Sequence, residues 1–239
     1  MKKKNILYAA LFALAAGTGN VSAQDGAAVN QLTSTEKKEG WQLLFDGKST
    51  GSWHTYQHKP GSWIVEDSSI VCHETAAKQY ADLVTNKQYK NFELVVDWKI
   101  APGANSGILY KVTEQYPQSY LSGPEYQLLD NDSYAGKIEP YQKTGANYAM
   151  NTPSSDAAKP VGEWNHTRIV VKDNHVEHWL NDVKVVEYTL GDEAWQQEKA
   201  HGKWKDAPGY GAAAKGAIAL QDYHGTGKVW FRNVKVREL

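Results

Sequence analysis

The sequence predicts an all-β fold, a sandwich of two antiparallel sheets or a jelly roll, on three observations. Short runs with apolar residues at every second position recur along the chain. Turn-forming pairs such as Pro102-Gly103 and Gly123-Pro124 separate these runs. Helical spacing is scarce, and only residues 192–200 are expected to form a short helix, capped by Asp192. Many short strands without alternating helices favour a sandwich over a parallel α/β fold.

The individual strands follow from this period of two. The clearest begins at Phe92, where apolar side chains at alternate positions continue to Trp98. Asn181-Asp182 separates two apolar runs by two residues, which is typical of a β-hairpin turn. Further strands are expected at residues 123–130, 166–171, 176–180, 217–221 and 229–236.

The first 23 residues have the pattern of a secretory signal peptide. Lysines precede a short apolar run over residues 6–16, and Val21-Ser22-Ala23 supplies small residues for cleavage. We therefore expect an exported protein, periplasmic or extracellular, that begins near Gln24. No segment approaches the roughly 20 apolar residues of a membrane-spanning helix. Residues 24–38 are expected to form a flexible leader, and residues 39–239 a single domain.

Composition excludes some partners. The chain has 26 basic and 27 acidic residues, and three of the basic ones lie in the signal peptide, so the mature net charge is about −4. This balance argues against nucleic acid or an anionic membrane as a partner. The single cysteine, Cys72, cannot form an intramolecular disulfide. Nine Trp and fourteen Tyr against four Phe suit burial beside polar groups and stacking on sugar rings.

The segment GPEYQLLD, residues 123–130, raises the question of an active site. In an extended strand Glu125 and Gln127 share one face, and Tyr126 and Leu128 share the other. The polar face is either the solvated side of a sheet or the floor of a site. A retaining glycosidase needs two carboxyl groups about 5–5.5 Å apart, and this face carries only Glu125 with certainty. Asp130 is expected to point the other way, at the strand end.

Other candidate residues have a structural alternative beside the functional one. Asn105 and Ser106, in APGANSGI, could face a ligand, although turn formation is the favoured interpretation. His175 and His178 would lie on opposite faces of a strand, which disfavours a shared metal ion. His224 follows a strand end and could act as a general acid or base. Trp53 could stack on a sugar, although core packing is the commoner role.

Successive blocks of the chain, in order, resemble a known family. They are WQLLFDGKSTGSWH at 41–54, YKNFELVVDWKIAPGANSGILYKV at 89–112, GPEYQLLDN at 123–131, KTGANY at 143–148, EWNHTRIVV at 163–171, VEHWLND at 176–182 and GAIALQDYHGTGKVWFRNVKVREL at 216–239. The family is that of the 3-keto-glycoside 1,2-lyase/3-keto-2-hydroxyglucal hydratases, also called 3-keto-disaccharide hydrolases or DUF1080. The resemblance covers about residues 39–239.

The resemblance implies a concanavalin A-like jelly roll with its site on the concave face. It also implies a substrate, a glycoside or disaccharide whose C3 hydroxyl an upstream sugar 3-dehydrogenase has oxidised to a ketone. A base would remove the C2 proton, the C1 substituent would leave by β-elimination, and water would add to the 2-hydroxyglucal. No cofactor is implied with certainty. A divalent cation that polarises the ketone would fit this chemistry, although no ligand set follows from the sequence.

The family's blocks map onto particular residues of this chain. Glu125 and Gln127 match its G-x-E-x-Q block, Glu125 as the base or as a cation ligand and Gln127 as a partner of substrate hydroxyls. Asn105 and Ser106 match the N-S-G block, and Gln221 begins the L-Q-D block. We expect these matched residues to bind the sugar and Trp53 to stack on it. Beside Glu125, His224 is expected to act in catalysis by binding a hydroxyl or the enolate.

This chain departs from the family pattern at two places. The usual L-Q-D-H-G has one extra residue here, Tyr223, which displaces His224. The hairpin usually written N-G is Asn181-Asp182, and Asp also tolerates a positive φ. Two other functions remain open beside the lyase: a non-catalytic, lectin-like carbohydrate-binding module, and a retaining glycosidase.

Overall fold

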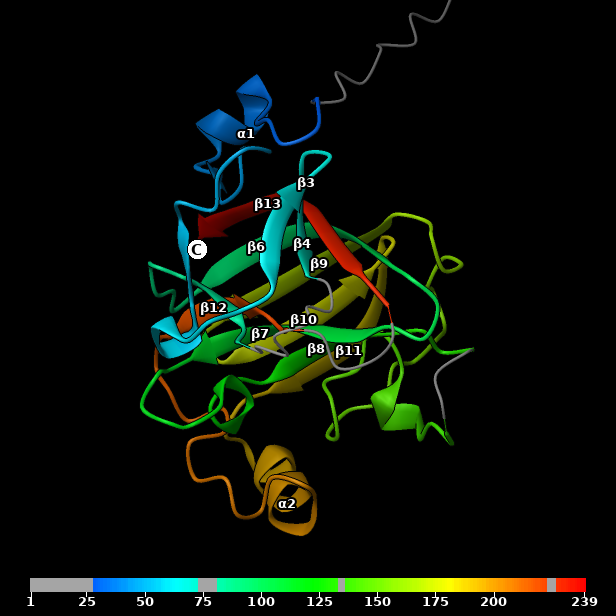
Figure 1. The fold of residues 1–239 in the computed structure, drawn as a ribbon. Coiled ribbons are helices and arrows are strands. Elements are labelled where there is room, and N and C mark those ends of the chain that lie inside the picture. Colours follow the sequence, from blue (N-terminus) through cyan, green and yellow to red (C-terminus); the bar gives the residue numbers. More distant parts are fainter. Residues whose placement is uncertain (1–27, 73–80, 133–135, 223–226) are drawn as a thin grey trace, which may run out of the picture.

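A computed structural model describes residues 28–72, 81–132, 136–222 and 227–239, and it shows two antiparallel β-sheets (Figure 1). The larger sheet has the order β11-β10-β9-β6-β13-β4-β3, and β1 pairs with β13 beside this path. Its strands are β1 (Gln42–Leu43), β3 (Trp63–Glu66), β4 (Ser69–Cys72), β6 (Phe92–Ile100), β9 (Asn165–Lys172), β10 (His175–Leu180), β11 (Val183–Thr189) and β13 (Val229–Glu238).

The smaller sheet has the order β2-β5-β12-β7-β8. Its strands are β2 (Trp53–Thr55), β5 (Leu83–Thr85), β7 (Asn105–Val112), β8 (Glu125–Leu129) and β12 (Ala217–Leu220). The other elements are α1 (Ser34–Lys38), α2 (Glu193–His201) and the 3-10 turns η1 (Tyr56–His58), η2 (Ser119–Leu121) and η3 (Pro140–Gln142). The all-β prediction is confirmed.

The core lies between the two sheets, where the alternating apolar residues meet. Every second side chain of β6, from Phe92 to Trp98, is fully buried, as the sequence predicts. Tyr126 and Leu128 of β8 reach into this core from the smaller sheet, and the Tyr126 ring lies 4.8 Å from that of His178 on β10. The opposite face of β8 therefore points away from the core.

Local turn and cap chemistry also agrees with the sequence. Asn181 and Asp182 both have positive φ, 48° and 67°, as a two-residue hairpin turn requires. The Asp192 side chain accepts a hydrogen bond from the Trp195 amide at the start of α2, and Gly202 ends that helix.

The expected turn at residues 101–107 is shorter than the sequence suggested. Pro102-Gly103 alone reverses the chain, since the Ala104 amide donates to the Ala101 carbonyl at 3.1 Å. Asn105 is already the first residue of β7, so the turn interpretation of Asn105 and Ser106 is wrong. Backbone hydrogen bonds to β8 hold this segment, so the Asn105 amide and the Ser106 hydroxyl are not used to form a turn.

The described part of the leader, residues 28–38, contacts the domain. Thr33 and Glu36 form a capping box at the start of α1, and the Glu36 carboxylate pairs with Lys235 of β13 at 2.7 Å. Asn30 exchanges hydrogen bonds with Asn233. Figure 1 shows α1 beside the C-terminal strand and α2 at the opposite end of the molecule. The signal peptide, residues 1–23, lies outside the described residues.

Candidate functional site

The polar face of β8 is buried, although it points away from the core. Glu125 is 4% exposed and Gln127 is 2% exposed. Across the sheet, Glu125 pairs with Leu109 and Gln127 pairs with Gly107 of β7. Because loops cover these side chains, the solvated-face alternative is excluded for β8.

Gly107 explains how Glu125 fits on this face. A methyl group on Gly107 would lie 2.4 Å from Oε1 of Glu125 and 2.7 Å from its Cγ. The Glu125 side chain therefore lies directly against the β7 backbone, which only glycine permits. The φ of Gly107 is not positive, so glycine is required at this position because there is no room for a Cβ atom and not because of the backbone conformation.

A pocket of about 260 Å³ opens above this face. Strand residues form its floor, and η2 together with two loops forms its walls. Its lining residues are Asn105, Tyr120, Glu125, Gln127, Tyr148, Lys203, Trp204 and Gln221. Polar groups on the floor and aromatic rings on the walls are the combination that binds a sugar ring.

The amides on the floor leave an acceptor available for a ligand. Nε2 of Gln127 donates to Oδ1 of Asn105 at 3.2 Å. Oε1 of Gln127 is buried and has no hydrogen-bond partner among the described residues. Since a buried polar atom without a partner costs about 1–3 kcal/mol, this oxygen is suited to a ligand hydroxyl.

Burial controls the protonation of Glu125. Desolvation, the dominant cause, raises the pKa of its carboxyl group from 4.5 to about 8. The nearby cation Lys203 and a hydrogen bond from Gln221 lower the pKa in part, whereas Asp82 raises it. The carboxyl group therefore titrates close to neutral pH, where a general base is most effective.

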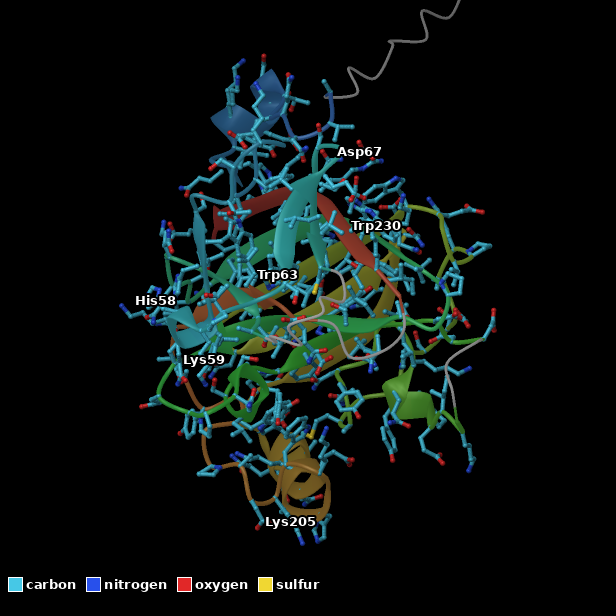
Figure 2. All side chains as sticks on the ribbon, viewed as in Figure 1. His58, Lys59, Trp63, Asp67, Lys205 and Trp230 are labelled. Atoms are coloured by element: carbon cyan, nitrogen blue, oxygen red, sulfur yellow. The ribbon has the colours of Figure 1, made fainter. Side chains whose placement is uncertain are left out.

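Lys203 is held in place by aromatic rings. Its Nζ lies 4.3 Å from the ring centre of Tyr148 and 4.7 Å from that of Trp204. Trp204 is in turn stacked on Tyr210 at 4.3 Å, and its indole N–H donates to the Tyr148 carbonyl at 3.1 Å. Lys205, on the same loop, is labelled at the α2 end of the molecule in Figure 2.

The structure brings four of the expected site residues together: Glu125, Gln127, Asn105 and Gln221. Ser106 does not line the pocket, because its fully buried hydroxyl donates to the Gln221 carbonyl at 2.8 Å and so ties β7 to the end of β12. Trp53 also lies elsewhere, packed in the core with its indole N–H bonded to the Leu44 carbonyl. His224 lies outside the described residues.

Asp130 and Asp222 have supporting contacts in the described structure. Asp130 accepts the Gly103 amide at 2.8 Å, and this fixes the turn before β7, as expected for a strand-end residue. Asp222 is buried, and it accepts the Ala81 amide at 2.7 Å and the Cys72 thiol at 3.0 Å. These contacts hold the end of β12, and with it Gln221, against the neighbouring strands.

Sequence reasoning missed four residues of the pocket walls: Tyr120, Tyr148, Lys203 and Trp204. They come from loops and from η2, where no hydrophobic period exists. KTGANY, which contains Tyr148, was one block of the resemblance, but nothing marked its tyrosine as a site residue. For Lys203-Trp204 the only local signal was an aromatic residue within a charged stretch, which is also typical of a solvated loop.

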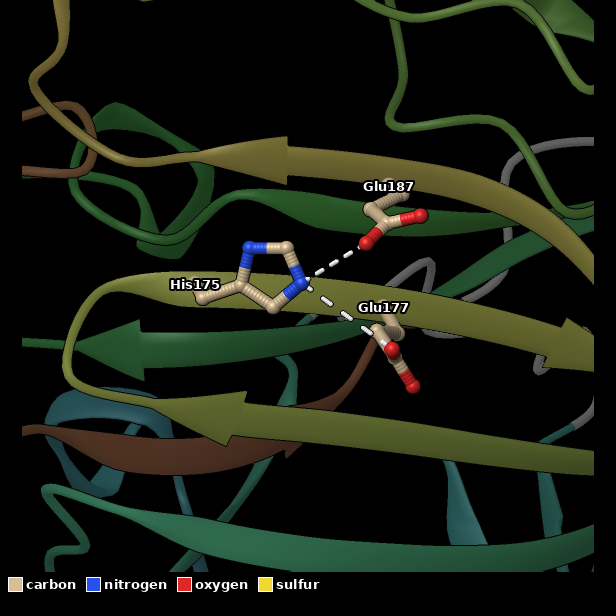
Figure 3. A group of neighbouring side chains, drawn as sticks. All are labelled: His175, Glu177 and Glu187. Carbon is tan, nitrogen blue, oxygen red and sulfur yellow. Dashed lines mark ion pairs between the residues drawn. The ribbon is translucent and has the colours of Figure 1, made fainter.

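The His175 and His178 side chains diverge, as the strand geometry predicts. His178 is fully buried between Tyr110 and the Gly145 carbonyl, and burial lowers its pKa to about 4. His175 lies outside the core with Glu177 and Glu187, and its Nε2 is 3.0 Å from the Glu187 carboxylate (Figure 3). One possible metal-ligand atom from each of His175, Glu177 and Glu187 lies within 4.8 Å of the other two.

The three side chains in Figure 3 belong to an ion-pair network that balances their charges. Glu177 and Glu187 are directly opposite each other on β10 and β11, where two negative charges repel. Lys184 pairs with both carboxylates and balances them. The group lies on a different sheet from the pocket, so it is not part of the candidate site.

Fold and site together define a jelly-roll sandwich with a candidate pocket on one sheet. The fold matches a Bacillus subtilis protein of unknown function described as having a galectin-like fold, with a TM-score of 0.50 and 12% identity, over 88% of this chain and 94% of that one. None of the described helices has the length and apolar character needed to cross a membrane.

The chain belongs to the family of 3-keto-alpha-glucoside-1,2-lyase-like domains, whose pattern matches residues 40–237. It is 34% identical over 232 residues to a 3-keto-disaccharide hydrolase of Bacteroides thetaiotaomicron, covering 84% of this chain and 79% of that protein. It is also similar to a crystal structure from Parabacteroides distasonis, provisionally described as a glycosyl hydrolase. That likeness has 42% identity and a TM-score of 0.82 over 89% of this chain and 100% of the other.

Proposed function

We propose that this protein is an exported enzyme that cleaves 3-keto-glycosides by β-elimination and then hydrates the product. The observation that carries the proposal is the single buried carboxyl group of Glu125, which has a pKa of about 8 and no second carboxylate lining its pocket among the described residues. A retaining glycosidase needs a carboxylate pair. An elimination needs one base and a group that stabilises an enolate.

The substrate is a glycoside whose C3 carries a ketone, so the C2–H bond is acidic. The Glu125 carboxylate removes the C2 proton, and the electron pair passes into the enolate at the C3 oxygen. The Lys203 ammonium lies in the same pocket and stabilises that negative charge. In a low-dielectric pocket a preorganised cation of this kind is worth far more than in water.

The leaving group departs in the second step. The electron pair of the enolate forms the C1–C2 double bond as the C1–O bond breaks, and the Glu125 carboxylic acid returns its proton to the departing oxygen. Water then adds to C1 of the 2-hydroxyglucal as the Glu125 carboxylate takes one of its protons, and the Glu125 carboxylic acid delivers that proton to C2. The net result is hydrolysis of the glycosidic bond, and Glu125 ends in its starting state.

The remaining pocket residues bind and orient the sugar. Oε1 of Gln127 accepts a hydrogen bond from a sugar hydroxyl. Asn105 holds the Gln127 amide by accepting its N–H. Gln221 holds the Glu125 carboxyl group by a hydrogen bond. The rings of Tyr120, Tyr148 and Trp204 offer faces for the apolar side of the sugar. A divalent cation would find oxygen donors in Glu125 and Gln127, and when bound it would polarise the ketone.

The place in metabolism follows from the substrate's chemistry. A C3 ketone on a glycoside must come from an oxidation, so we propose that a sugar 3-dehydrogenase acts before this enzyme. The predicted signal peptide supports a periplasmic or extracellular setting, in which the mature chain begins near Gln24.

The test compares matched intact and 3-oxidised disaccharides with the purified mature protein. Cleavage of the oxidised sugar alone supports the proposal. Cleavage of the intact sugar would support a retaining glycosidase. Binding of either sugar without cleavage would support a lectin-like module, and either of these two results would overturn the proposal.

A further inference from the structure

A second cavity, of about 500 Å³, lies apart from the pocket above β8. It is bounded by α2, by the turn between β9 and β10, and by the loop at residues 208–214. Among the described residues its lining includes Lys90 and Lys199 and no aspartate or glutamate. A protein whose mature net charge is about −4 thus has a cavity in which both charged lining residues are lysines.

In the described part of the chain neither lysine of this cavity forms an ion pair with a carboxylate. Nζ of Lys199 donates to the Tyr210 carbonyl, at 3.2 Å. Burial lowers the pKa of Lys199, because its ammonium group is partly removed from water without a counter-charge.

A third lysine lies just behind the cavity wall. Lys111 is 2% exposed, and its Nζ donates to Oδ1 of Asn174 at 3.1 Å and to the Ala213 carbonyl at 3.3 Å. Both acceptors belong to residues that line the cavity, and both are neutral. Burial, followed by repulsion from Lys90, lowers the pKa of Lys111. Buried charges are normally paired, so this arrangement favours a negative charge nearby.

Trp195 contributes an aromatic ring to the same wall. Its side chain is 5% exposed. A methyl group on Gly211, which also lines the cavity, would lie 2.6 Å from Cζ2 of the Trp195 ring. The ring therefore closes the cavity on the Gly211 side.

The cavity on the other side of Trp195 has the opposite character. It measures about 440 Å³, and its lining includes Glu187, Asp192 and Glu198. The absence of carboxylates from the lysine-lined cavity is therefore a local property and does not reflect the loops around α2 in general.

From these contacts we infer that the lysine-lined cavity binds an oxyanion, a phosphate or carboxylate group carried by a small molecule of about monosaccharide size. Lys90 and Lys199 contact the anion directly. Lys111, which lies behind the cavity wall, stabilises the anion through its positive charge. The cavity volume lies within the range typical of small-molecule sites. This inference does not depend on the activity proposed for the pocket above β8.

The experiment uses the mature protein, titrated with inorganic phosphate, glucuronate and uncharged glucose at constant ionic strength set with chloride. Binding is followed by calorimetry and by the shift of the unfolding midpoint. We expect saturable binding of phosphate or of glucuronate, and the stronger of the two identifies the anionic group. Glucose should not compete for this cavity. Failure of both anions to bind better than chloride overturns the inference.

Variants of the two lining lysines test whether the anion binds in this cavity. Lys90→Gln and Lys199→Gln are each expected to weaken anion binding at least about tenfold, because each removes one charged hydrogen bond. Lys205→Gln, which removes an exposed lysine from the neighbouring loop, is the matched control and should bind as the parent protein does. Equal binding by all three variants would show that the anion sits elsewhere and would overturn the inference.

Discussion

The Glu125 side chain lies against the backbone of Gly107, so closely that a single added methyl group would come within 2.4 Å of its carboxylate oxygen. Gly107 lies on β7 and Glu125 on β8, and they are diagonal neighbours on the same face of the sheet. This contact fixes the position of the proposed base, and it gives the glycine of the Asn105-Ser106-Gly107 unit a specific role.

Gly107→Ala should therefore displace Glu125 without removing its charge. We expect kcat/KM for a 3-keto-disaccharide to fall about 100-fold, the usual cost of misplacing a reacting group by about 1 Å. Overpacking should also cost about 1–3 kcal/mol of stability, measured by denaturant unfolding. Gly51→Ala is the control, because its methyl group would meet only the flexible Ser49 hydroxyl, at 3.3 Å. Normal kinetics in Gly107→Ala would show that this contact is not needed.

Glu125→Gln should abolish turnover and yet stabilise the fold above neutral pH. The folded-state pKa of about 8 lies above the unfolded value of 4.5, so folding takes up a proton between these pH values. The free energy of unfolding of the parent protein should fall as pH rises through this window. Gln carries no such charge, so the variant's advantage should grow from none at pH 4 to no more than about 5 kcal/mol above pH 8. Parallel stability curves for the two proteins would contradict the burial argument.

The pH dependence of catalysis follows from the same group. A base must be ionised to accept the C2 proton, so kcat/KM should rise tenfold per pH unit and level off near pH 8. A profile that falls through this range would instead make Glu125 an acid in the free enzyme.

Lys203→Met should lower kcat more than it raises KM. The variant keeps an unbranched side chain against Tyr148 and Trp204 but removes the charge that stabilises the enolate. We expect kcat to fall about 100- to 1,000-fold, the range seen when one oxyanion donor is lost. The variant Lys205→Met controls for loss of a lysine from this loop. An unchanged kcat would remove Lys203 from the proposed chemistry.

The fold could be predicted because its signals are local. Alternating burial in β6, the Asn181-Asp182 turn and the Asp192 cap each depend on a few neighbouring residues. The same alternation placed Glu125 and Gln127 on one face. It could not show that this face is buried, because the covering loops come from distant parts of the chain.

The walls of the pocket could not be predicted for the same reason. Lys203 lines the same pocket as Glu125, and the next residue, Trp204, is stacked on Tyr210; no sequence pattern records that contact. Ser106 matched a family block, but in the structure its hydroxyl supports the backbone of Gln221. Membership of a motif therefore pointed to four residues that line one pocket, and it left the contacts of each side chain to the geometry.

The central claim is that Glu125 removes the C2 proton of a 3-keto sugar. It is tested most directly by comparing the cleavage rates of a 3-keto-disaccharide and of the same sugar carrying deuterium at C2. We expect slower cleavage of the deuterated sugar by the parent enzyme and no cleavage of either sugar by Glu125→Gln. Equal rates for the two sugars, together with cleavage by Glu125→Gln, would contradict it.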